Sequence, residues 1–443
     1  MSRKYFGTDG VRGHVGEHPM TVEFALRLAS AAARVLAPEG GTALVGKDTR
    51  LSGYMFEAAL EAGCVAAGVD VSLIGPLPTP GIAYLTQRFG CRFGAVISAS
   101  HNPYEDNGIK FFDATGSKLS DDVELQIEAL LDGPVLTRES TKLGRATRVD
   151  KSRVVYQQFC ASTMPAGMDL SGFKIVIDCA HGAAYKVAPR VLTDLGAEII
   201  PIGCSPNGRN INLRCGAMVP ELLQLTVAGV QADVGIALDG DGDRLVMVDH
   251  LGRLVDGDRL LYVIARDRME LGELHGPVVG TVMSNLGLQQ ALEASGVPFM
   301  RAAVGDRYVL ELLKQHGGVL GGETSGHLLC LDRTTTGDGI VSALQVLAAM
   351  KRSGRSLAEL ASGMAHFPQV MVNVRVRGRI DPGQSPAIQS AVQRVEASLG
   401  TSGRVVLRAS GTEPLIRVMV EGQDEAVVAR HANELAEVVR QAV

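Results

Sequence analysis

The chain has 443 residues, which is too long for one hydrophobic core and, at about 150 residues per domain, predicts roughly three domains. The net charge of -5, from 43 basic and 48 acidic residues, provides no overall positive field to hold a nucleic acid, and a hydrophobic fraction of 46% argues against long disordered tails. No uncharged apolar run approaches the roughly 20 residues of a membrane span and the amino terminus lacks a signal-peptide core, so we expect a cytoplasmic chain without nucleic-acid or membrane partners.

Short β-branched runs alternate with amphipathic stretches along most of the chain. The expected helices of the first part span residues 22–36 and 54–68. The expected strands span residues 42–46, 71–75, 93–98, 174–178, 234–238 and 277–282. The last four strands each run into a loop rich in Gly, Asp, Asn or Ser. This alternation predicts an α/β fold with largely buried strands and with ligands at their carboxyl ends.

The carboxyl-terminal segment has a different pattern. Residues 370–376, 405–408 and 415–420 resemble antiparallel strands, followed by a helix at residues 425–443. One face of that helix is apolar and is expected to pack on the sheet; it carries Val428, Ala432, Leu435, Val439 and Ala442. We therefore expect a smaller α+β domain at this end of the chain.

Polar stretches near residues 145–153, 252–258 and 363–368 indicate three domain boundaries. The expected domains span residues 1–150, 151–252, 253–366 and 367–443. The predicted fold is thus α/β, with three mixed α/β domains and a smaller α+β carboxyl-terminal domain.

Three carboxylates, those of Asp239, Asp241 and Asp243, directly follow one of the expected strands and precede Arg244. At ~4 Å and an effective dielectric constant of about 20, two carboxylates repel by about 4 kcal/mol, so such a cluster needs a cation. A hard divalent metal with oxygen ligands fits. A calcium EF-hand loop begins similarly, but Arg244 stands where that loop needs glycine and His250 where it needs glutamate. A solvated acidic turn is the remaining alternative.

Ser100 stands at the end of another expected strand, in the segment SASHNP, which leads on to Lys110. A serine in such a loop can accept a phosphoryl group, but a hydroxyl there equally well caps backbone groups. Neither the G-x-S-x-G elbow of serine hydrolases nor the G-x-x-x-x-G-K-[ST] nucleotide loop occurs. Acyl transfer and ATP hydrolysis are therefore disfavoured.

Two more loops combine glycines with polar side chains. The segment GGETSGH at 321–327 offers a carboxylate, a hydroxyl and an imidazole, which suit vicinal sugar hydroxyls and proton transfer. The segment RASGTEP at 408–414, with Arg417 close behind, has the chemistry of a phosphate cradle. Taken alone, the first loop is equally compatible with an ordinary turn and the second with a hairpin loop.

In chain order the four loops are the one with Ser100, the one with Asp239, and those at 321–327 and 408–414. Together, in that order and over essentially the whole chain, they resemble the loops of the α-D-phosphohexomutase superfamily. The opening segment RKYFGTDGVRG, at 3–13, looks like the phosphoglucosamine mutase branch rather than the phosphomannomutase/phosphoglucomutase branch. The resemblance implies a four-domain phosphohexomutase-like architecture around a central cleft. It also implies an isomerase that reversibly converts glucosamine 6-phosphate to glucosamine 1-phosphate, supplying UDP-N-acetylglucosamine and cell-wall synthesis.

The resemblance further implies a role for each matching residue. Ser100 would be phosphorylated at rest, and one Mg²⁺ per chain would be held by the phosphoserine with Asp239, Asp241 and Asp243. The residues implied to surround the transferring phosphoryl group are Arg12, Lys110 and Arg244. Those implied to contact the sugar are Glu323, Ser325 and His327. Those implied to hold the phosphate that is not reacting are Arg408, Ser410, Gly411, Thr412 and Arg417.

The implied general acid or base is His327 or Lys110, and glucosamine 1,6-bisphosphate is the implied intermediate and activator. The expected partner is a small-molecule sugar phosphate, and a homodimer stays open. Three alternative functions also stay open. They are a phosphomutase for mannose or glucose phosphates, a metal-dependent phosphatase that hydrolyses the phosphoserine, and a sugar-phosphate sensor without turnover.

Overall fold

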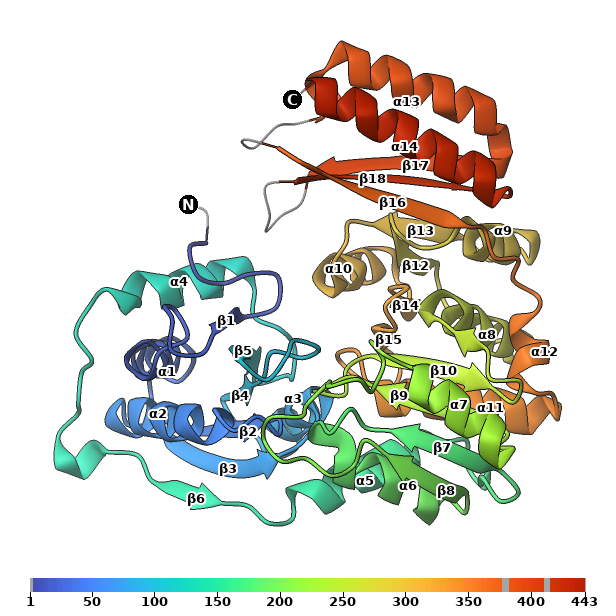
Figure 1. The fold of residues 1–443 in the computed structure, drawn as a ribbon. Helices are drawn as coiled ribbons and strands as arrows, with labels where there is room; N and C mark the ends of the chain where they lie inside the picture. The colour runs from blue at the N-terminus through green and yellow to red at the C-terminus, as the bar shows by residue number, and fades with distance from the viewer. Residues whose placement is uncertain (1–2, 377–381, 410–414, 443) are drawn as a thin grey trace.

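The computed structural model describes residues 3–376, 382–409 and 415–442. Within them, four β-sheets follow one another along the chain, each covered by helices, and Figure 1 shows the four resulting regions in blue, green, yellow to orange, and red. The predicted fold class is confirmed: three mixed α/β regions precede a smaller α+β region. The boundaries expected at 150, 252 and 366 stay predictions. No described helix is both long enough and apolar enough to cross a membrane.

The first region has a six-stranded sheet in the order β1-β5-β4-β2-β3-β6. Its strands are β1 (Val11–His14), β2 (Thr42–Lys47), β3 (Asp70–Pro76), β4 (Phe93–Ile97), β5 (Asp106–Asp113) and β6 (Ala146–Arg148). Its helices are α1 (Val22–Leu36), α2 (Gly53–Ala66), α3 (Thr79–Arg88) and α4 (Asp121–Leu131). Ala43 and Val45 belong to the core formed with α1 and α2, whereas Leu44 between them packs with α3. This period of two buries both faces of the strand.

The second region has a five-stranded sheet in the order β11-β10-β9-β7-β8. Its strands are β7 (Lys174–Asp178), β8 (Glu198–Ile202), β9 (Val234–Leu238), β10 (Leu245–Asp249) and β11 (Leu254–Val255). Its helices are α5 (Ser152–Ser162), α6 (Ala188–Asp194) and α7 (Glu221–Val230). Strands β7, β8 and β9 are parallel, so their carboxyl ends lie at one edge of the sheet.

The third region has a four-stranded sheet in the order β13-β12-β14-β15. Its strands are β12 (Val278–Thr281), β13 (Phe299–Ala302), β14 (Leu320–Gly322) and β15 (Leu328–Cys330). Its helices are α8 (Gly257–Leu271), α9 (Leu286–Ala294), α10 (Asp306–His316), α11 (Gly339–Ser353) and α12 (Leu357–Ala361). One continuous core of buried side chains joins this region to the second and to the α3 side of the first. The first three regions are therefore packed as one body.

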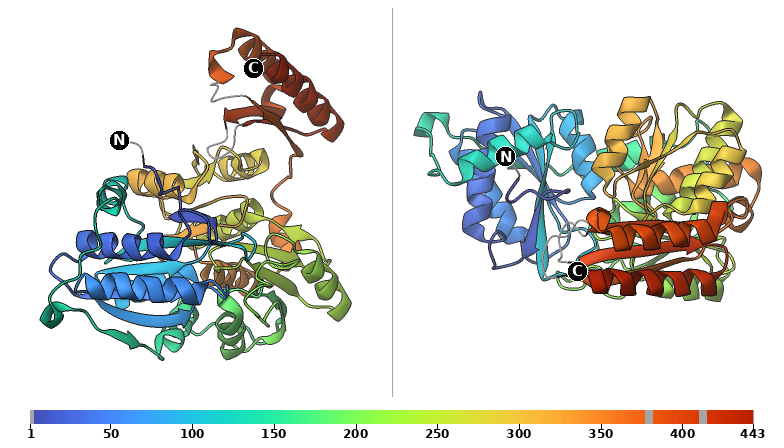
Figure 2. Two further views of the ribbon diagram at one scale, coloured as in Figure 1. Left: turned by 60° about the vertical axis from the view of Figure 1, so that its left-hand side comes forward. Right: turned by 90° about the horizontal axis from the view of Figure 1, so that it is seen from above.

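The fourth region has an antiparallel sheet in the order β16-β18-β17 under two helices. Its elements are β16 (Gln369–Arg375), α13 (Pro386–Leu399), β17 (Gly403–Ala409), β18 (Leu415–Gly422) and α14 (Glu425–Ala442). Four of the five apolar positions expected to pack on the sheet from α14 are buried, but Ala442 in its last turn is exposed. Figure 1 and the left view of Figure 2 show this region next to the third region rather than the first. Glu421 accepts from Leu286 N at 2.7 Å across that contact.

Candidate active site

A cavity of about 600 Å³ opens where the first three regions meet. Loops that follow β4, β9, β13 and β14, together with the amino-terminal segment, supply its walls. Seven of the predicted site residues line it: Arg12, Ser100, Asp243, Arg244, Glu323, Ser325 and His327. The structure thus brings together side chains that lie more than 300 residues apart in the sequence.

Ser100 has a left-handed backbone, with φ of 52°, which is costly for a residue other than glycine. The side chain of Ser98 accepts from Ser100 N at 2.9 Å, and Asn212 Nδ2 donates to Ser100 O at 2.9 Å. In this conformation Ser100 Oγ donates to Asp239 Oδ2 at 2.6 Å. The His101 ring nitrogen Nδ1 lies 3.4 Å from the same hydroxyl. The backbone strain therefore aims the hydroxyl at the aspartate loop.

Arg50 holds this loop in place, although the sequence analysis did not single it out. The side chain is fully buried, and its Nε donates to Asp48 Oδ2 at 2.8 Å. Its remaining donors go to four carbonyl oxygens of the serine loop, those of Ser100, Asn102, Pro103 and Asp106. A planar guanidinium with five donors is the side chain suited to this task. The segment KDTR, directly after an expected strand, is the signal that was available.

The aspartate loop follows β9 and fits a divalent cation. Carboxylate oxygens of Asp239, Asp241 and Asp243 lie within 4.8 Å of one another, and all three residues are buried. Burial, followed by the charges of its two neighbours, raises the pKa of Asp239 well above its usual range. Oδ1 of Asp241 and Oδ1 of Asp243 are buried without a hydrogen-bond partner among the described residues. Unsatisfied oxygens in a repulsive cluster are what a hard cation would bind.

Lys110 is buried, with its ammonium 2.8 Å from Asp241, 2.8 Å from Asp9 and 3.8 Å from Asp243. Burial opposes the charge on this lysine, but Asp241 and then Asp9 raise its pKa above the ordinary value. Lys110 is therefore a fixed cation beside the aspartate loop.

His327 lies between two carboxylates: its Nδ1 is 3.6 Å from Asp243 Oδ1 and its Nε2 is 3.2 Å from Asp306 Oδ2. Burial opposes protonation, but Asp243 and then Asp306 raise the pKa of His327 to about 10. Gly337 packs against the ring, because a Cβ there would lie 2.3 Å from Nε2. In this arrangement the imidazole carries a positive charge. Its neighbour in the same loop, Glu323, accepts from Gly305 N at 3.0 Å.

The fourth region supplies two arginines that do not line the cavity. Arg408 in β17 pairs directly with Arg417 in β18. Burial, followed by the charge of Arg417, lowers the pKa of Arg408. Like charges directly opposite in a sheet are unfavourable, so this pair is suited to an anion. The predicted partners Ser410, Gly411 and Thr412 lie outside the described residues.

Three charged residues that the sequence analysis did not assign contact the predicted ones. Asp9 accepts from Arg12 and pairs with Lys110, and Asp306 pairs with His327. Lys118 lies between these two carboxylates, 2.6 Å from Asp9 and 2.5 Å from Asp306. The motif TDG around Asp9 and the start of a helix at Asp306 were weak signals, whereas Lys118 gave none.

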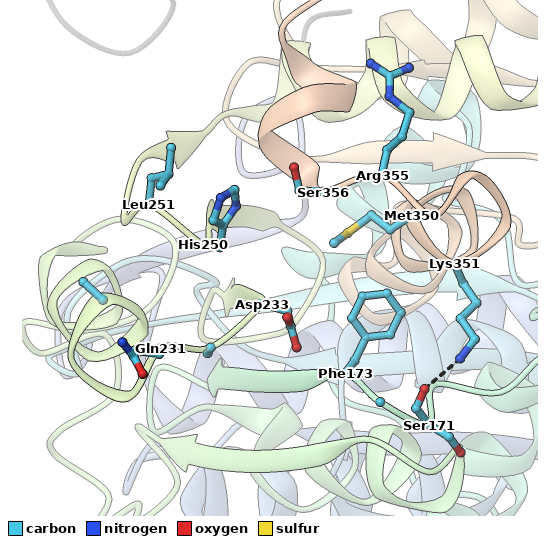
Figure 3. Close-up of a pocket in the computed structure, with 14 residues that line it drawn as sticks. Ser171, Phe173, Gln231, Asp233, His250, Leu251, Met350, Lys351, Arg355 and Ser356 are labelled. Carbon is cyan, nitrogen blue, oxygen red and sulfur yellow. Dashed lines mark hydrogen bonds between the residues drawn. The ribbon is translucent and has the colours of Figure 1, made fainter.

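A second cavity, of about 770 Å³, lies between the second and third regions (Figure 3). It sits at the amino ends of β7 and β9, away from the aspartate loop, and includes Phe173 and Asp233. The ammonium of Lys351 donates to Ser171 O at 2.7 Å, and the guanidinium of Arg355 points away from Phe173. Its described lining includes no predicted site residue, so the cavity at Ser100 is the candidate active site.

Four families of domains match successive parts of the chain. They are described as phosphoglucomutase/phosphomannomutase alpha/beta/alpha domain I at residues 3–134, domain II at 156–252, domain III at 256–367 and the C-terminal domain at 371–438. Two similar proteins are the phosphoglucosamine mutase of Methylococcus capsulatus, at 58% identity over 100% of this chain and 99% of that one, and that of Pasteurella multocida, at 57% identity over 99% of both.

Solved structures show the same fold. A phosphoglucomutase/phosphomannomutase family protein of Burkholderia thailandensis matches with a TM-score of 0.81 at 24% identity, over 98% of this chain and 97% of that one. The N-acetylphosphoglucosamine mutase of Aspergillus fumigatus, solved with GlcNAc-6P and magnesium, matches with a TM-score of 0.68 at 18% identity, over 100% of this chain and 96% of that one.

Proposed function

We propose that this chain, which belongs to the phosphoglucosamine mutases within the phosphoglucomutase/phosphomannomutase family, reversibly converts glucosamine 6-phosphate to glucosamine 1-phosphate. One observation carries the proposal. The strained Ser100 presents its hydroxyl to Asp239 at 2.6 Å, inside a cavity that also holds Arg12 and Arg244. A nucleophilic oxygen among cations and carboxylates suits phosphoryl transfer rather than acyl transfer.

The resting enzyme is a phosphoserine at Ser100. The sugar O1 attacks the phosphorus and the bond from phosphorus to Ser100 Oγ breaks. The proposed general acid, Lys110 or His327, which are both protonated here, gives a proton to Oγ and is restored by the proton from O1. Lys110 lies beside the aspartates, and Arg12 has a buried Nε without a partner among the described residues, so both can stabilise charge on the phosphoryl oxygens. Arg244 completes the cationic surround from the cavity wall.

The metal proposed here is one Mg²⁺, held by Asp239, Asp241, Asp243 and an oxygen of the phosphoserine. When bound, it would neutralise negative charge on the phosphoryl group. The chain's own contribution is to fix the carboxylates: Asp239 Oδ1 accepts from Gly242 N at 3.1 Å and from Arg244 N at 3.2 Å. Gly242 has φ of 75°, which this tight turn requires.

The product of the first transfer is glucosamine 1,6-bisphosphate, which we propose turns round so that its 6-phosphate returns to Ser100. Supplied from outside, the same compound would act as an activator by rephosphorylating the serine. The proposed sugar contacts are Glu323, Ser325 and His327. The proposed contacts of the phosphate that is not reacting are Arg408, Arg417 and the loop with Ser410, Gly411 and Thr412. A cytoplasmic location and a homodimer stay predictions.

An assay that measures formation of the sugar 1-phosphate, glucosamine 1-phosphate among them, tests the proposal. Purified protein with Mg²⁺ and a trace of bisphosphate is given glucosamine, glucose or mannose 6-phosphate in parallel. The amino sugar should be turned over with the highest kcat/KM, without accumulation of inorganic phosphate. Accumulated phosphate would instead identify a phosphatase, and absence of turnover with all three sugars would leave only a sensor.

A further inference from the structure

Six ionisable side chains, of which four line the cavity, form a closed ring. In order around the ring they are Lys110, Asp9, Lys118, Asp306, His327 and Asp243. Successive N–O distances are 2.8, 2.6, 2.5, 3.2, 3.6 and 3.8 Å, and no side chain in the ring is more than 20% exposed. Nitrogens of two lysines and a histidine therefore alternate with three carboxylates, and each carboxylate lies between two of these nitrogens.

The ring joins all three of the regions that meet at the cavity. The first region contributes Asp9, Lys110 and Lys118, the second contributes Asp243, and the third contributes Asp306 and His327. A buried charge is costly unless it is paired, so removal of one member leaves its neighbours unbalanced. Burial opposes the charge of Lys118, but Asp306 and then Asp9 raise its pKa, so it is a cation here.

We propose that Lys118 is a positioning residue, which closes the ring and so fixes Lys110 at the phosphoryl group relative to His327 at the sugar. Lys118 is not among the described lining residues of the cavity, so it acts through Asp9 and Asp306 rather than by touching substrate. This inference rests on the proposed function, because it assigns the ring a role in that reaction.

The chain on both sides of Lys118 is fastened to the third region. Thr335 Oγ1 donates to Gly116 O at 2.8 Å, and Arg307 Nη2 donates to Leu119 O at 2.9 Å. The same guanidinium donates to Glu124 Oε1 at 3.0 Å. These bonds anchor the backbone that carries Lys118, so the lysine can hold the two regions at one separation.

Loss of the Lys118 charge would affect the carboxylates of Asp306 and Asp9 differently. Asp306 would keep only His327 as a ring partner and would compete with Asp243 for it. Asp9 would keep Arg12 and Lys110 and, with one cation fewer, would draw Lys110 away from the aspartate loop. Both shifts misplace groups at the reacting centre, whereas Arg408 and Arg417, proposed to hold the other phosphate, lie outside the ring. The rate of the chemical step should therefore suffer more than substrate binding.

The experiment compares Lys118→Gln with Lys118→Arg, in the full chain with Mg²⁺ and bisphosphate. Lys118→Gln should lower kcat ten- to a hundredfold and change KM less than threefold, whereas Lys118→Arg should recover at least a third of wild-type kcat. Lys142→Gln is the matched control, since Lys142 pairs only with the exposed Glu139 at 3.5 Å among the described residues, and it should match the wild type.

A double-mutant cycle with Asp306→Asn separates positioning from general destabilisation. If the ring couples the two residues, their effects should not multiply. The kcat of the double variant should then be at least fivefold higher than the value expected from multiplying the kcat ratios of the two single variants. Wild-type kcat in Lys118→Gln, a loss confined to KM, or losses that simply multiply would overturn the proposal. If circular dichroism shows Lys118→Gln to be unfolded, a kcat of Lys118→Arg more than tenfold below wild type overturns it. A wild type that makes no glucosamine 1-phosphate refutes the proposed function instead.

Discussion

The reacting end and the fourth region differ in the groups that lie next to their cations. At the reacting end Lys110, Lys118 and His327 are each held between protein carboxylates. In the fourth region Arg408 and Arg417 face each other across two strands. Cations held by protein carboxylates are in place before substrate arrives, which is the requirement of chemistry. Two arginines directly opposite each other concentrate positive charge with which an incoming phosphate can pair, which is the requirement of binding.

Removal of the nucleophile should give the largest effect on the reacting end. Ser100→Ala should fold and bind substrate, yet lose mutase activity by roughly 10⁴-fold or more, because the covalent route is gone. Intact-mass analysis should show a phosphorylated fraction in the wild type and in the exposed-serine control Ser162→Ala, but none in Ser100→Ala. Near-normal turnover by Ser100→Ala would refute the phosphoserine mechanism.

The aspartate loop should give the next largest effect. Asp241→Asn removes an anionic oxygen ligand, so Mg²⁺ affinity should fall and kcat should drop by about 10² to 10³-fold, with unfolding temperature changing little. Calorimetric titration with Mg²⁺ measures the affinity, and Asp194→Asn, at an exposed helix position, is the control. Activity that survives EDTA would show that this loop is not a catalytic metal site.

Arg408→Ala tests the other side of the comparison. A charge-assisted bond to phosphate contributes about 1.5 to 3 kcal/mol, so KM should rise roughly ten- to a hundredfold while Ser100 stays phosphorylated in freshly purified protein. The variant should also release more bisphosphate and recover partly when bisphosphate is added. An unchanged KM together with lost Ser100 phosphorylation would reverse the roles of the two regions.

Asp258 differs from the carboxylates of the ring, because it makes no salt bridge within the described part of the chain. It is buried and accepts from Asn285 N at 2.8 Å and from Thr324 Oγ1 at 2.7 Å, yet burial and then the charge of Asp256 raise its pKa to about 6. Because the folded-state pKa lies above the unfolded value, its stabilising contribution is present below about pH 4 and is lost as the pH rises through 6.

Asp258→Asn keeps a side-chain oxygen that can accept hydrogen bonds and removes the loss of stability that accompanies ionisation of Asp258. Between pH 4 and pH 7, the free energy of unfolding of the variant should rise by about 2 to 3 kcal/mol relative to that of the wild type. The difference between the two unfolding temperatures should grow by a few degrees over the same range. A difference between the two proteins that does not change with pH would mean that Asp258 has an ordinary pKa.

Strongly periodic segments were predictable from the sequence. The bounds of α1, β7 and β9 match the expected ranges, because apolar runs with clear polar ends define them. Strand β5 was not expected, since it begins with Asp106 and Asn107, and its partner β4 is antiparallel. Because β5 begins with polar residues, the sequence pattern did not predict it, and its pairing with β4 is seen only in the folded sheet.

The site residues also fall into those that a local sequence pattern predicts and those that depend on contacts between distant parts of the chain. Ser100 and the aspartate loop lie in motifs directly after strands, so local spacing was enough to find them. Arg50 and Lys118 act through contacts with residues distant in the chain, and Lys118 bonds a partner 188 residues away. A lysine in a polar turn has no local signal of such a role. What could not be predicted is therefore the set of groups that hold the catalytic ones.

That separation of 188 residues also has a consequence for synthesis of the chain. At about 5 to 20 residues per second, Asp306 follows Lys118 from the ribosome by roughly 10 to 40 seconds. During that interval the first region has Ser100 and Lys110 but lacks Asp243 and His327 for part or all of the time. An unfinished chain therefore carries a nucleophile without the surroundings that activate it, and the enzyme matures only when its third region has been made and docked.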